Sequence, residues 1–412
     1  MNALAESVAS HGPHASHAPQ AARIANDQQA LDVAHAVART LAEGASQRDR
    51  ERRLPYAEIG IYSASGLWGI AVPREFGGAE VSYTTLAEVS AIISEADPAL
   101  GQIPQNHFYM LDVLRVNGTR DQQAFYFERA LAGERLGNAL SERGTKTVAD
   151  YRTTLTPDGD GFRINGTKFY STGALFAQWI PIVAKAADDT LYVAFASTQT
   201  PGLSVVDDWS GFGQRTTGSG TTTLDNVYVE ASAVVPYSAA FDARPTTVGP
   251  IGQLIHAAVD LGIARAAVAD ARRFVRERSR PWIDSGVERA SDDPLTLELF
   301  GKLALQLHAA EALVERAGRR VDAAVKESTA QTVAAASIAV AEARAATTEI
   351  ALQASTRLIE LAGTQATLAE HNLDRHWRNA RTHTLHDPVR WKYIAVGNYY
   401  LNDVLPPRHG AL

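Results

Sequence analysis

The segment Arg378-Asn379-Ala380-Arg381-Thr382-His383-Thr384-Leu385-His386-Asp387-Pro388 gathers two imidazoles and a carboxylate in one short stretch of the chain. Imidazole titrates near neutral pH, so His386 and His383 are candidates for moving a proton during a reaction. Asp387 is a chemically competent base as well, although Pro388 removes a backbone hydrogen-bond donor beside it. The segment therefore predicts acid–base chemistry at this position.

Composition excludes several classes of protein. The 412 residues suffice for a large core, and 21% charged with 45% apolar residues is typical of a soluble globular protein. A net charge of −7 argues against nucleic acid as a partner. The absence of cysteine excludes disulfides, thiolate metal sites and a cysteine nucleophile. With no membrane-length apolar run and no signal-peptide pattern, we expect no membrane partner and a cytoplasmic location.

Hydrophobic periodicity and turn signals divide the chain into parts of different character. We predict a disordered tail (1–24), an N-terminal helical domain (25–135), a β domain (136–236) and a C-terminal helical bundle (237–412). In the tail, the spacing of His11, His14 and His17 leaves a metal-binding role as an alternative.

The β domain is marked by residues that alternate as in strands and by recurrent turn signals. These signals are Pro157-Asp158-Gly159, Asn165-Gly166, Pro201-Gly202 and Asp225-Asn226. After it, long helices are predicted at 251–279, 294–326, 330–362 and 389–403, which indicates a four-helix bundle.

Four motifs, spread over most of the chain, resemble those of the flavin-dependent acyl-CoA dehydrogenases. They are Pro73–Gly78, Asn138–Glu142, Gly166–Gly173 and the opening segment, where that family carries its catalytic carboxylate. The resemblance implies an α+β fold of the acyl-CoA dehydrogenase type, with an N-terminal helical domain, a middle β-barrel domain and a C-terminal four-helix bundle. Here His386-Asp387-Pro388 replaces the family's Tyr-Glu-Gly, which implies different chemistry on the same scaffold.

Two further departures concern the cofactor. The family's glycine-rich loop against FAD corresponds to Glu360–Ala366, where only Gly363 remains, and close backbone approach to a pyrophosphate needs glycine. Upstream, Arg280 joins Arg278 in Arg278-Ser279-Arg280-Pro281-Trp282. A second guanidinium suits the terminal phosphate dianion of FMN, so FMN is expected in place of FAD.

With these departures the chain resembles a narrower group, the reduced-flavin-dependent monooxygenases of sulfur metabolism of the dibenzothiophene monooxygenase type. The shared stretches are Asp207-Asp208-Trp209, Ser279–Trp282, His376–Asn379 and Arg381–Pro388. The resemblance implies an enzyme that takes FMNH2 made elsewhere and uses O2 through a flavin C4a-hydroperoxide to oxygenate a small organosulfur substrate.

The same resemblance assigns roles to individual residues. His386 is expected as the acid, His107 as the second choice, Asn138 to orient the intermediate, and Thr172 to hold the flavin N5–H; His383 is expected to support His386. Cofactor contacts are expected from Ser141, Tyr170, Ser171, Thr172, Trp209, Arg280, Trp282 and Gly363. Phe108, Tyr109, Leu111 and Phe241 are candidates for lining the substrate pocket, with core packing as the alternative. No metal ligands are predicted among these residues.

The stretch Gly211–Thr216 lacks the third glycine and the βαβ setting of a dinucleotide-binding loop, so a separate NAD(P)H:FMN reductase is expected. A homotetramer is implied by the family, and the Ala-rich helix at 330–356 allows close helix approach. Two alternatives remain: an acyl-CoA dehydrogenase with Asp387 as base, and a helical scaffold without activity.

Overall fold

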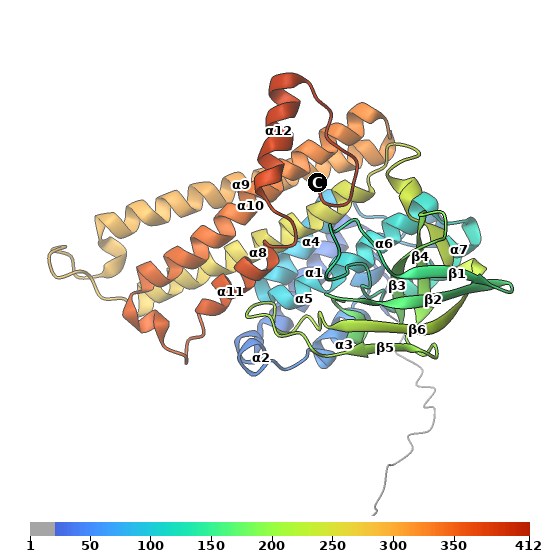
Figure 1. The fold of residues 1–412 in the computed structure, drawn as a ribbon. Coiled ribbons are helices and arrows are strands. Elements are labelled where there is room, and N and C mark those ends of the chain that lie inside the picture. Colours follow the sequence, from blue (N-terminus) through green and yellow to red (C-terminus); the bar gives the residue numbers. More distant parts are fainter. Residues whose placement is uncertain (1–20) are drawn as a thin grey trace, which may run out of the picture.

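The computed structural model describes residues 21–412, so the predicted histidines of the tail lie outside the described part of the chain. Helices come first, a sheet follows, and long helices close the chain (Figure 1). The N-terminal helices are α1 (Asp27–Ala42), α2 (Ala45–Glu51), α3 (Tyr56–Ala64), α4 (Tyr83–Ala96), α5 (Pro98–Gln102), α6 (Pro104–Asn117) and α7 (Arg120–Leu131). This order confirms the predicted fold class.

Asp97 decides where one helix ends and the next begins. Its backbone is extended, as expected before Pro98, which stops α4. Its carboxylate then accepts hydrogen bonds from the backbone N–H groups of Ala99 (3.1 Å) and Leu100 (3.4 Å) at the start of α5. Five residues later this short helix ends at Gln102, which is buried in the interior.

The same carboxylate anchors α2 through the buried side chain of Arg48. The Arg48 guanidinium lies 3.0 Å from Asp97 Oδ2 and 3.1 Å from Glu58 Oε1. It also donates to the Glu43 backbone carbonyl at 2.8 Å. One buried arginine therefore connects α2, α3 and the junction between α4 and α5.

The middle of the chain forms a single twisted sheet (Figure 1). Its strands are β1 (Thr154–Asp158), β2 (Gly161–Lys168), β3 (Trp179–Lys185), β4 (Leu191–Ser197), β5 (Leu203–Val206), β6 (Thr221–Glu230) and β7 (Val234–Pro236). The order is β5-β6-β2-β1-β3-β4-β7, and all neighbours are antiparallel except β1 and β3. The predicted β domain is confirmed, but its hydrogen-bonded order ends at β5 and β7, so no ladder closes it into a barrel.

Two of the predicted turns lie inside strands. Asn165-Gly166 belongs to β2 and Asp225-Asn226 to β6, and the register of this pair shifts between Ile164 and Gly166. The Asn226 N–H donates to Asn165 Oδ1 at 2.8 Å, and Asn226 has φ +54°. The turn-forming residues therefore make a β-bulge in which the two irregular segments satisfy each other.

The C-terminal part is built on three long helices, α8 (Val248–Glu277), α9 (Pro294–Lys326) and α10 (Ala330–Ala362). The bounds of α9 and α10 agree with the predicted ones. Two shorter helices follow, α11 (Asp374–His383) and α12 (Arg390–Asn402), and α12 stands out from the bundle in Figure 1. The helix predicted at 389–403 is confirmed as α12, which is shorter than the other three, and α4 of the N-terminal part packs against α8 and α9.

The alanines of α10 lie inside this bundle, where they allow close packing against α8 and α9. They are therefore not the oligomer surface that the sequence suggested. Exposed large apolar side chains lie instead on α9 and on and after α12: Leu295, Leu297, Leu305, Trp391, Ile394, Tyr400, Leu401 and Val404.

Among the described helices, α8 is the one with the length and apolarity to span a membrane, with a mean hydropathy of 1.3 over its most apolar window. Of that window, 83% is buried within the protein. The composition of α8 is therefore that of a core helix.

We predict that Arg48→Met lowers stability sharply, because it leaves Asp97 and Glu58 as buried carboxylates without that guanidinium. Removing one partner of a buried ion pair costs about 3–5 kcal/mol. The measurement is the urea midpoint at fixed protein concentration, with Arg39→Met, an exposed arginine on α1, as the matched control. Equal midpoints for the two variants would contradict the anchoring role of Arg48.

Candidate active site

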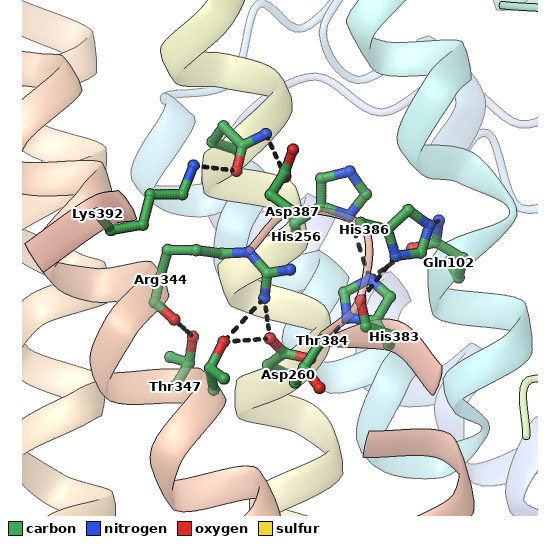
Figure 2. Close-up of polar contacts among 12 residues, drawn as sticks. Gln102, His256, Asp260, Arg344, Thr347, His383, Thr384, His386, Asp387 and Lys392 are labelled. Carbon is green, nitrogen blue, oxygen red and sulfur yellow. Dashed lines mark hydrogen bonds and ion pairs between the residues drawn. The ribbon is translucent and has the colours of Figure 1, made fainter. Parts of the chain in front are cut away.

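His383, the last residue of α11, occupies the centre of a buried polar cluster (Figure 2). Its side chain has no exposed surface. Nδ1 lies 2.6 Å from Asp260 Oδ1, and Nε2 lies 2.8 Å from Gln102 Oε1 and 3.1 Å from His256 Nδ1. The imidazole therefore joins α11 to α8 and to the end of α5.

Asp260 is the charged centre of this cluster. Arg344 on α10 forms an ion pair with its Oδ2, and Thr348 donates to the same oxygen at 3.3 Å. Burial raises the pKa of Asp260 to about 6, although the Arg344 guanidinium acts in the opposite direction. Burial also lowers the pKa of His383 well below its usual value, with the positive charge of Arg344 adding to the effect.

His386 follows in the loop after α11 and, unlike His383, is reached by solvent. Its Nδ1 donates to the His383 carbonyl at 2.7 Å, and its Nε2 lies 3.3 Å from the Gln102 amide nitrogen. Protein atoms crowd the ring closely, and this partial desolvation lowers its pKa. His386 is thus accessible to a substrate, while its hydrogen bonds to His383 and Gln102 fix the orientation of its ring.

His256, on α8, adds a third imidazole, and one nitrogen of each ring lies within 4.8 Å of the others. Burial, followed by the neighbouring histidines and Arg344, lowers the pKa of His256 well below its usual value. The facing nitrogens of these rings are engaged by Gln102 and by each other. Because Arg344 also places a positive charge beside them, we assign no metal ion to this cluster.

Asp387 points away from the three histidines, as Figure 2 shows. Its Oδ2 accepts a hydrogen bond from Gln253 Nε2 at 2.8 Å. Lys392 donates to Gln253 Oε1 at 3.0 Å, and burial lowers the pKa of this lysine to about 8. Asp387 is therefore held in a second polar group, in which its carboxylate has a bonding partner.

A buried ion pair connects the two predicted flavin motifs of the middle domain. Lys168 has no exposed surface, and its Nζ lies 2.7 Å from Glu142 Oε1. The Phe169 N–H donates to the Ser141 carbonyl at 2.9 Å. These contacts fix Ser141 beside the segment that carries Tyr170 and Thr172.

A chain of hydroxyls fixes the direction in which the Thr172 side chain donates. Thr217 Oγ1 donates to the Gln214 carbonyl at 3.0 Å, so it accepts from Ser219 Oγ at 2.6 Å. Ser219 Oγ in turn accepts from Thr172 Oγ1 at 2.6 Å. The single proton of Thr172 is therefore used, and its oxygen is left as an acceptor.

The remaining predicted residues of the middle domain differ in exposure. Tyr170 is 49% exposed and lies edge-on to the half-buried Trp209, with 6.2 Å between ring centroids. Ser171 is fully buried and accepts from Thr222 Oγ1, so its hydroxyl faces the interior. Asn138 Oδ1 accepts from the Leu140 N–H at 3.0 Å. Tyr170, Trp209 and Thr172 together offer ring faces and an acceptor to a flat amphipathic ligand.

His107 has a different environment from the one its predicted role requires. Its Nδ1 accepts from the Leu136 N–H at 3.1 Å, and its Nε2 donates to the Trp68 carbonyl at 2.8 Å. Burial lowers its pKa to about 4. With both nitrogens bonded to backbone and no exposed surface, His107 is positioned to hold segments together and not to act as the acid.

Three of the predicted pocket residues, Phe108, Tyr109 and Leu111, are members of the main apolar core, and Phe241 packs against it. The alternative of core packing therefore accounts for them.

Arg280, Trp282 and Gly363 are not brought to the other cofactor residues within one chain. Ser279 donates to the Leu361 and Ala362 carbonyls, so the 278–282 segment lies beside the Gly363 loop. Figure 1 places the connection between α8 and α9 at the end of the bundle opposite the sheet. Trp282 is 70% exposed, and Arg280 makes no ion pair with any residue of 21–412.

Sequence reasoning identified the two histidines but missed Gln102, His256, Asp260 and Arg344. A signal was present in α8, where His256 and Asp260 stand four residues apart within an otherwise apolar helical face. Gln102 and Arg344 offered none, because only the tertiary fold brings them to the histidines.

Comparison with known proteins agrees with this geometry. The acyl-CoA dehydrogenase N-terminal, middle and C-terminal domain models match residues 26–134, 137–227 and 254–391. Dibenzothiophene monooxygenase of Rhodococcus qingshengii is 33% identical over 404 residues, covering 93% of this chain and 96% of the relative. A probable FMNH2-dependent monooxygenase of Pseudomonas putida, SfnC, is 34% identical over 92% of this chain and 96% of that protein.

The structural comparison covers the same region. The FMN-bound structure of TdsC from Paenibacillus sp. A11-2 has a TM-score of 0.89 at 32% identity, over 93% of this chain and all of that one. The described elements, the domain matches and the relatives therefore agree: the chain belongs to the acyl-CoA dehydrogenase family, together with the dibenzothiophene monooxygenases.

Proposed function

We propose that this protein is an FMNH2-dependent monooxygenase that oxygenates a small organosulfur compound. The observation that carries the proposal is the solvent-reached His386, held by His383 and Gln102, in the segment where the family's dehydrogenases carry their carboxylate base. The similarity to dibenzothiophene monooxygenase supports the substrate class, and the FMN-bound relative supports the cofactor. A small organosulfur molecule is thus the proposed substrate.

Bound reduced FMN supplies the electrons with which O2 is divided between the oxygenated product and water. The chain contributes proton positions and orientation. Thr172 Oγ1, an acceptor by its hydroxyl chain, would hold the N5–H of the reduced ring, with Tyr170 and Trp209 against its faces and Asn138 at its edge. His386 Nε2 would give a proton to the departing oxygen. Because His107 is fully bonded, His386 is the proposed acid.

The dehydrogenase alternative requires a carboxylate free to remove a substrate proton. Asp387 is bonded to Gln253 and turned away from the histidines, so its environment does not favour that role. The FMN-bound relative also favours oxygenation. FMNH2 dependence in SfnC, as its name states, supports a separate reductase as the source of reduced flavin for this chain.

A complete cofactor site is proposed to need a second copy of the chain. Tyr170, Thr172 and Trp209 lie at the sheet, whereas Arg280, Trp282 and Gly363 lie at the far end of the bundle. The exposed apolar residues of α9 and α12 offer a surface on which copies could associate, in agreement with the expected homotetramer. Arg280, which makes no ion pair with an acidic residue of 21–412, would then reach the phosphate of the neighbour's FMN.

The proposed function is tested by adding chemically reduced FMN and oxygenated buffer to the protein with dibenzothiophene and smaller sulfides, sulfoxides and sulfones. We predict an oxygenated product from at least one of these, and loss of about 10²–10⁴ in its rate for His386→Ala, the range for a removed acid catalyst. The matched control is His308→Ala, an exposed histidine on α9. No oxygenated product together with flavin reduction by acyl-CoA would establish the dehydrogenase instead.

We predict that Ser219→Ala uncouples the reaction, because it frees the Thr172 hydroxyl to donate, so that its oxygen no longer has to act as an acceptor. The expected result is several-fold more hydrogen peroxide per product, with FMNH2 affinity changed by less than the roughly tenfold value of one hydrogen bond. Ser204→Ala, exposed on β5, is the control. Unchanged peroxide yield would show that the hydroxyl chain does not govern Thr172.

The shared cofactor site predicts complementation between two defective chains. Arg280→Ala should raise the Kd for FMNH2 by about 10- to 150-fold, the worth of a charge-assisted hydrogen bond. At FMNH2 concentrations where that variant is inactive, co-expression with His386→Ala should restore activity, because mixed oligomers contain some sites with neither defect. If the whole site lies within one chain, every site keeps one defect and co-expression restores nothing.

A further inference from the structure

Gln102 bridges the two histidines of the active-site segment through its amide group. Its Oε1 lies 2.8 Å from His383 Nε2, and its Nε2 lies 3.3 Å from His386 Nε2. The side chain is buried at the end of α5 and reaches the histidines from outside the bundle, as Figure 2 shows. An amide has a hydrogen-bond donor (NH2) and an acceptor (C=O), so Gln102 donates to one imidazole and accepts from the other.

The hydrogen bonds fix where the protons are. His386 Nδ1 faces the His383 carbonyl, which only accepts, so Nδ1 carries a proton. A neutral His386 therefore has a bare Nε2, which accepts from the Gln102 NH2 group. The amide oxygen then faces His383 Nε2, and that nitrogen must carry a proton. His256 Nδ1, at 3.1 Å, accepts a share of the same proton.

The Asp260–His383 pair holds a further proton. With a proton on Nε2, a neutral His383 has a bare Nδ1, and the 2.6 Å contact to Asp260 Oδ1 requires a proton between these atoms. Burial raises the pKa of Asp260 and lowers that of His383, whereas the Arg344 guanidinium at Oδ2 favours the carboxylate. The resting pair therefore shares one proton in the 2.6 Å contact, with the carboxylate held by Arg344.

We propose that Gln102, His383 and Asp260 form a positioning unit that stores one proton and supplies it to His386, whose catalytic role rests on the proposed function. In the stored state one proton is shared between Asp260 Oδ1 and His383 Nδ1, one lies on His383 Nε2 and one lies on His386 Nδ1. In the loaded state the Gln102 amide has turned over. The proton of His383 Nε2 has passed to His386 Nε2, and the shared proton remains on His383 Nδ1.

Both states contain three protons: one shared by Asp260 and His383, one on His383 Nε2 and one on His386 before, and one on His383 and two on His386 after. The loaded state has a carboxylate at Asp260, which the Arg344 guanidinium stabilises, and an imidazolium at His386. The turned amide donates to the bare His383 Nε2 and accepts from His386 Nε2–H. Because the amide accepts from one ring and donates to the other, only one of the two nitrogens, His383 Nε2 or His386 Nε2, carries a proton at a time.

Other charged groups face this unit from the elements around it. They are His256 on α8, Arg344 on α10, Asp387 in the loop and Lys392 on α12. Arg344 and Lys392 oppose protonation of the rings, whereas Asp387 favours it. None of these groups is placed to bridge His383 and His386, so the link between the rings depends on Gln102.

The unit is tested on the full-length protein by following the reaction of His386 with diethyl pyrocarbonate, which acylates unprotonated imidazole. The rate is measured against pH by mass spectrometry of the His386 peptide, with the exposed His35 on α1 as internal reference. Because coupled groups titrate in shared steps, wild-type His386 should show a two-step profile. Gln102→Met, which removes the amide at similar length, should give a single step.

The role of Asp260 is tested in both backgrounds. Asp260→Asn should move the His386 midpoint down by about one pH unit, because the negative charge that holds the shared proton on His383 is lost. In Gln102→Met the same change should move it by less than half as much. Equal shifts in the two backgrounds, or a single-step wild-type profile, would overturn the proposal. If Asp260→Asn does not fold, because Arg344 loses its partner, the profiles of wild type and Gln102→Met decide alone.

A catalytic readout separates this inference from the proposed function. The pH dependence of product formation should move with the His386 profile in Gln102→Met, whereas a purely structural role would lower the rate equally at every pH. Acylation profiles as predicted with no oxygenated product would leave the proton-storing unit standing and remove the monooxygenase proposal. Oxygenated product together with a single-step wild-type profile would support the monooxygenase proposal and overturn the proton-storing unit.

Discussion

Asp260 is a carboxylate without exposed surface on which three helices of the bundle meet. Arg344 contacts it from α10 and His383 from the end of α11. The Asp260 carboxylate on α8 therefore has its bonding partners only when both neighbouring helices are in place. A buried charge that loses one partner costs about 3–5 kcal/mol, comparable to much of a domain's net stability. The packing of the bundle and the orientation of His383 are consequently determined by the same contacts.

In the middle domain a different buried ion pair determines how segments pack. Lys168 and Glu142 are buried together, and they align the end of β2, just before Thr172, with the segment that carries Ser141. A third buried charge, Arg48, fixes the start of α5 through Asp97, and α5 ends at Gln102. The pairs at Asp260 and Arg48 therefore position His383 and Gln102 at the active-site segment, and the Lys168–Glu142 pair positions Thr172 and Ser141 in the middle domain.

Sequence reasoning succeeded where the signal was local. The bounds of α9 and α10 followed from Pro294 and from long uninterrupted helical periodicity, and His383 and His386 lie together because they are three residues apart. It failed where partners decide the outcome. Asn165-Gly166 and Asp225-Asn226 have the residues of turns, but each faces the other across a strand pair and forms a bulge. The amide of Gln102 could not be placed, since nothing near it in sequence indicates His383.

The predicted cofactor residues show a further limit of prediction from sequence: the residue types can be identified, but not where they lie in space. Tyr170 and Thr172 resemble the family motif as closely as Arg280 and Trp282 do, yet the first two follow strand β2 and the last two lie in the connection between α8 and α9. Figure 1 shows that connection at the end of the bundle opposite the sheet. A motif reports which residues contact a ligand, but it carries no information on which copy of the chain provides them. Trp282 is 70% exposed and Arg280 makes no ion pair among residues 21–412, and both side chains would be covered in the proposed association of two copies.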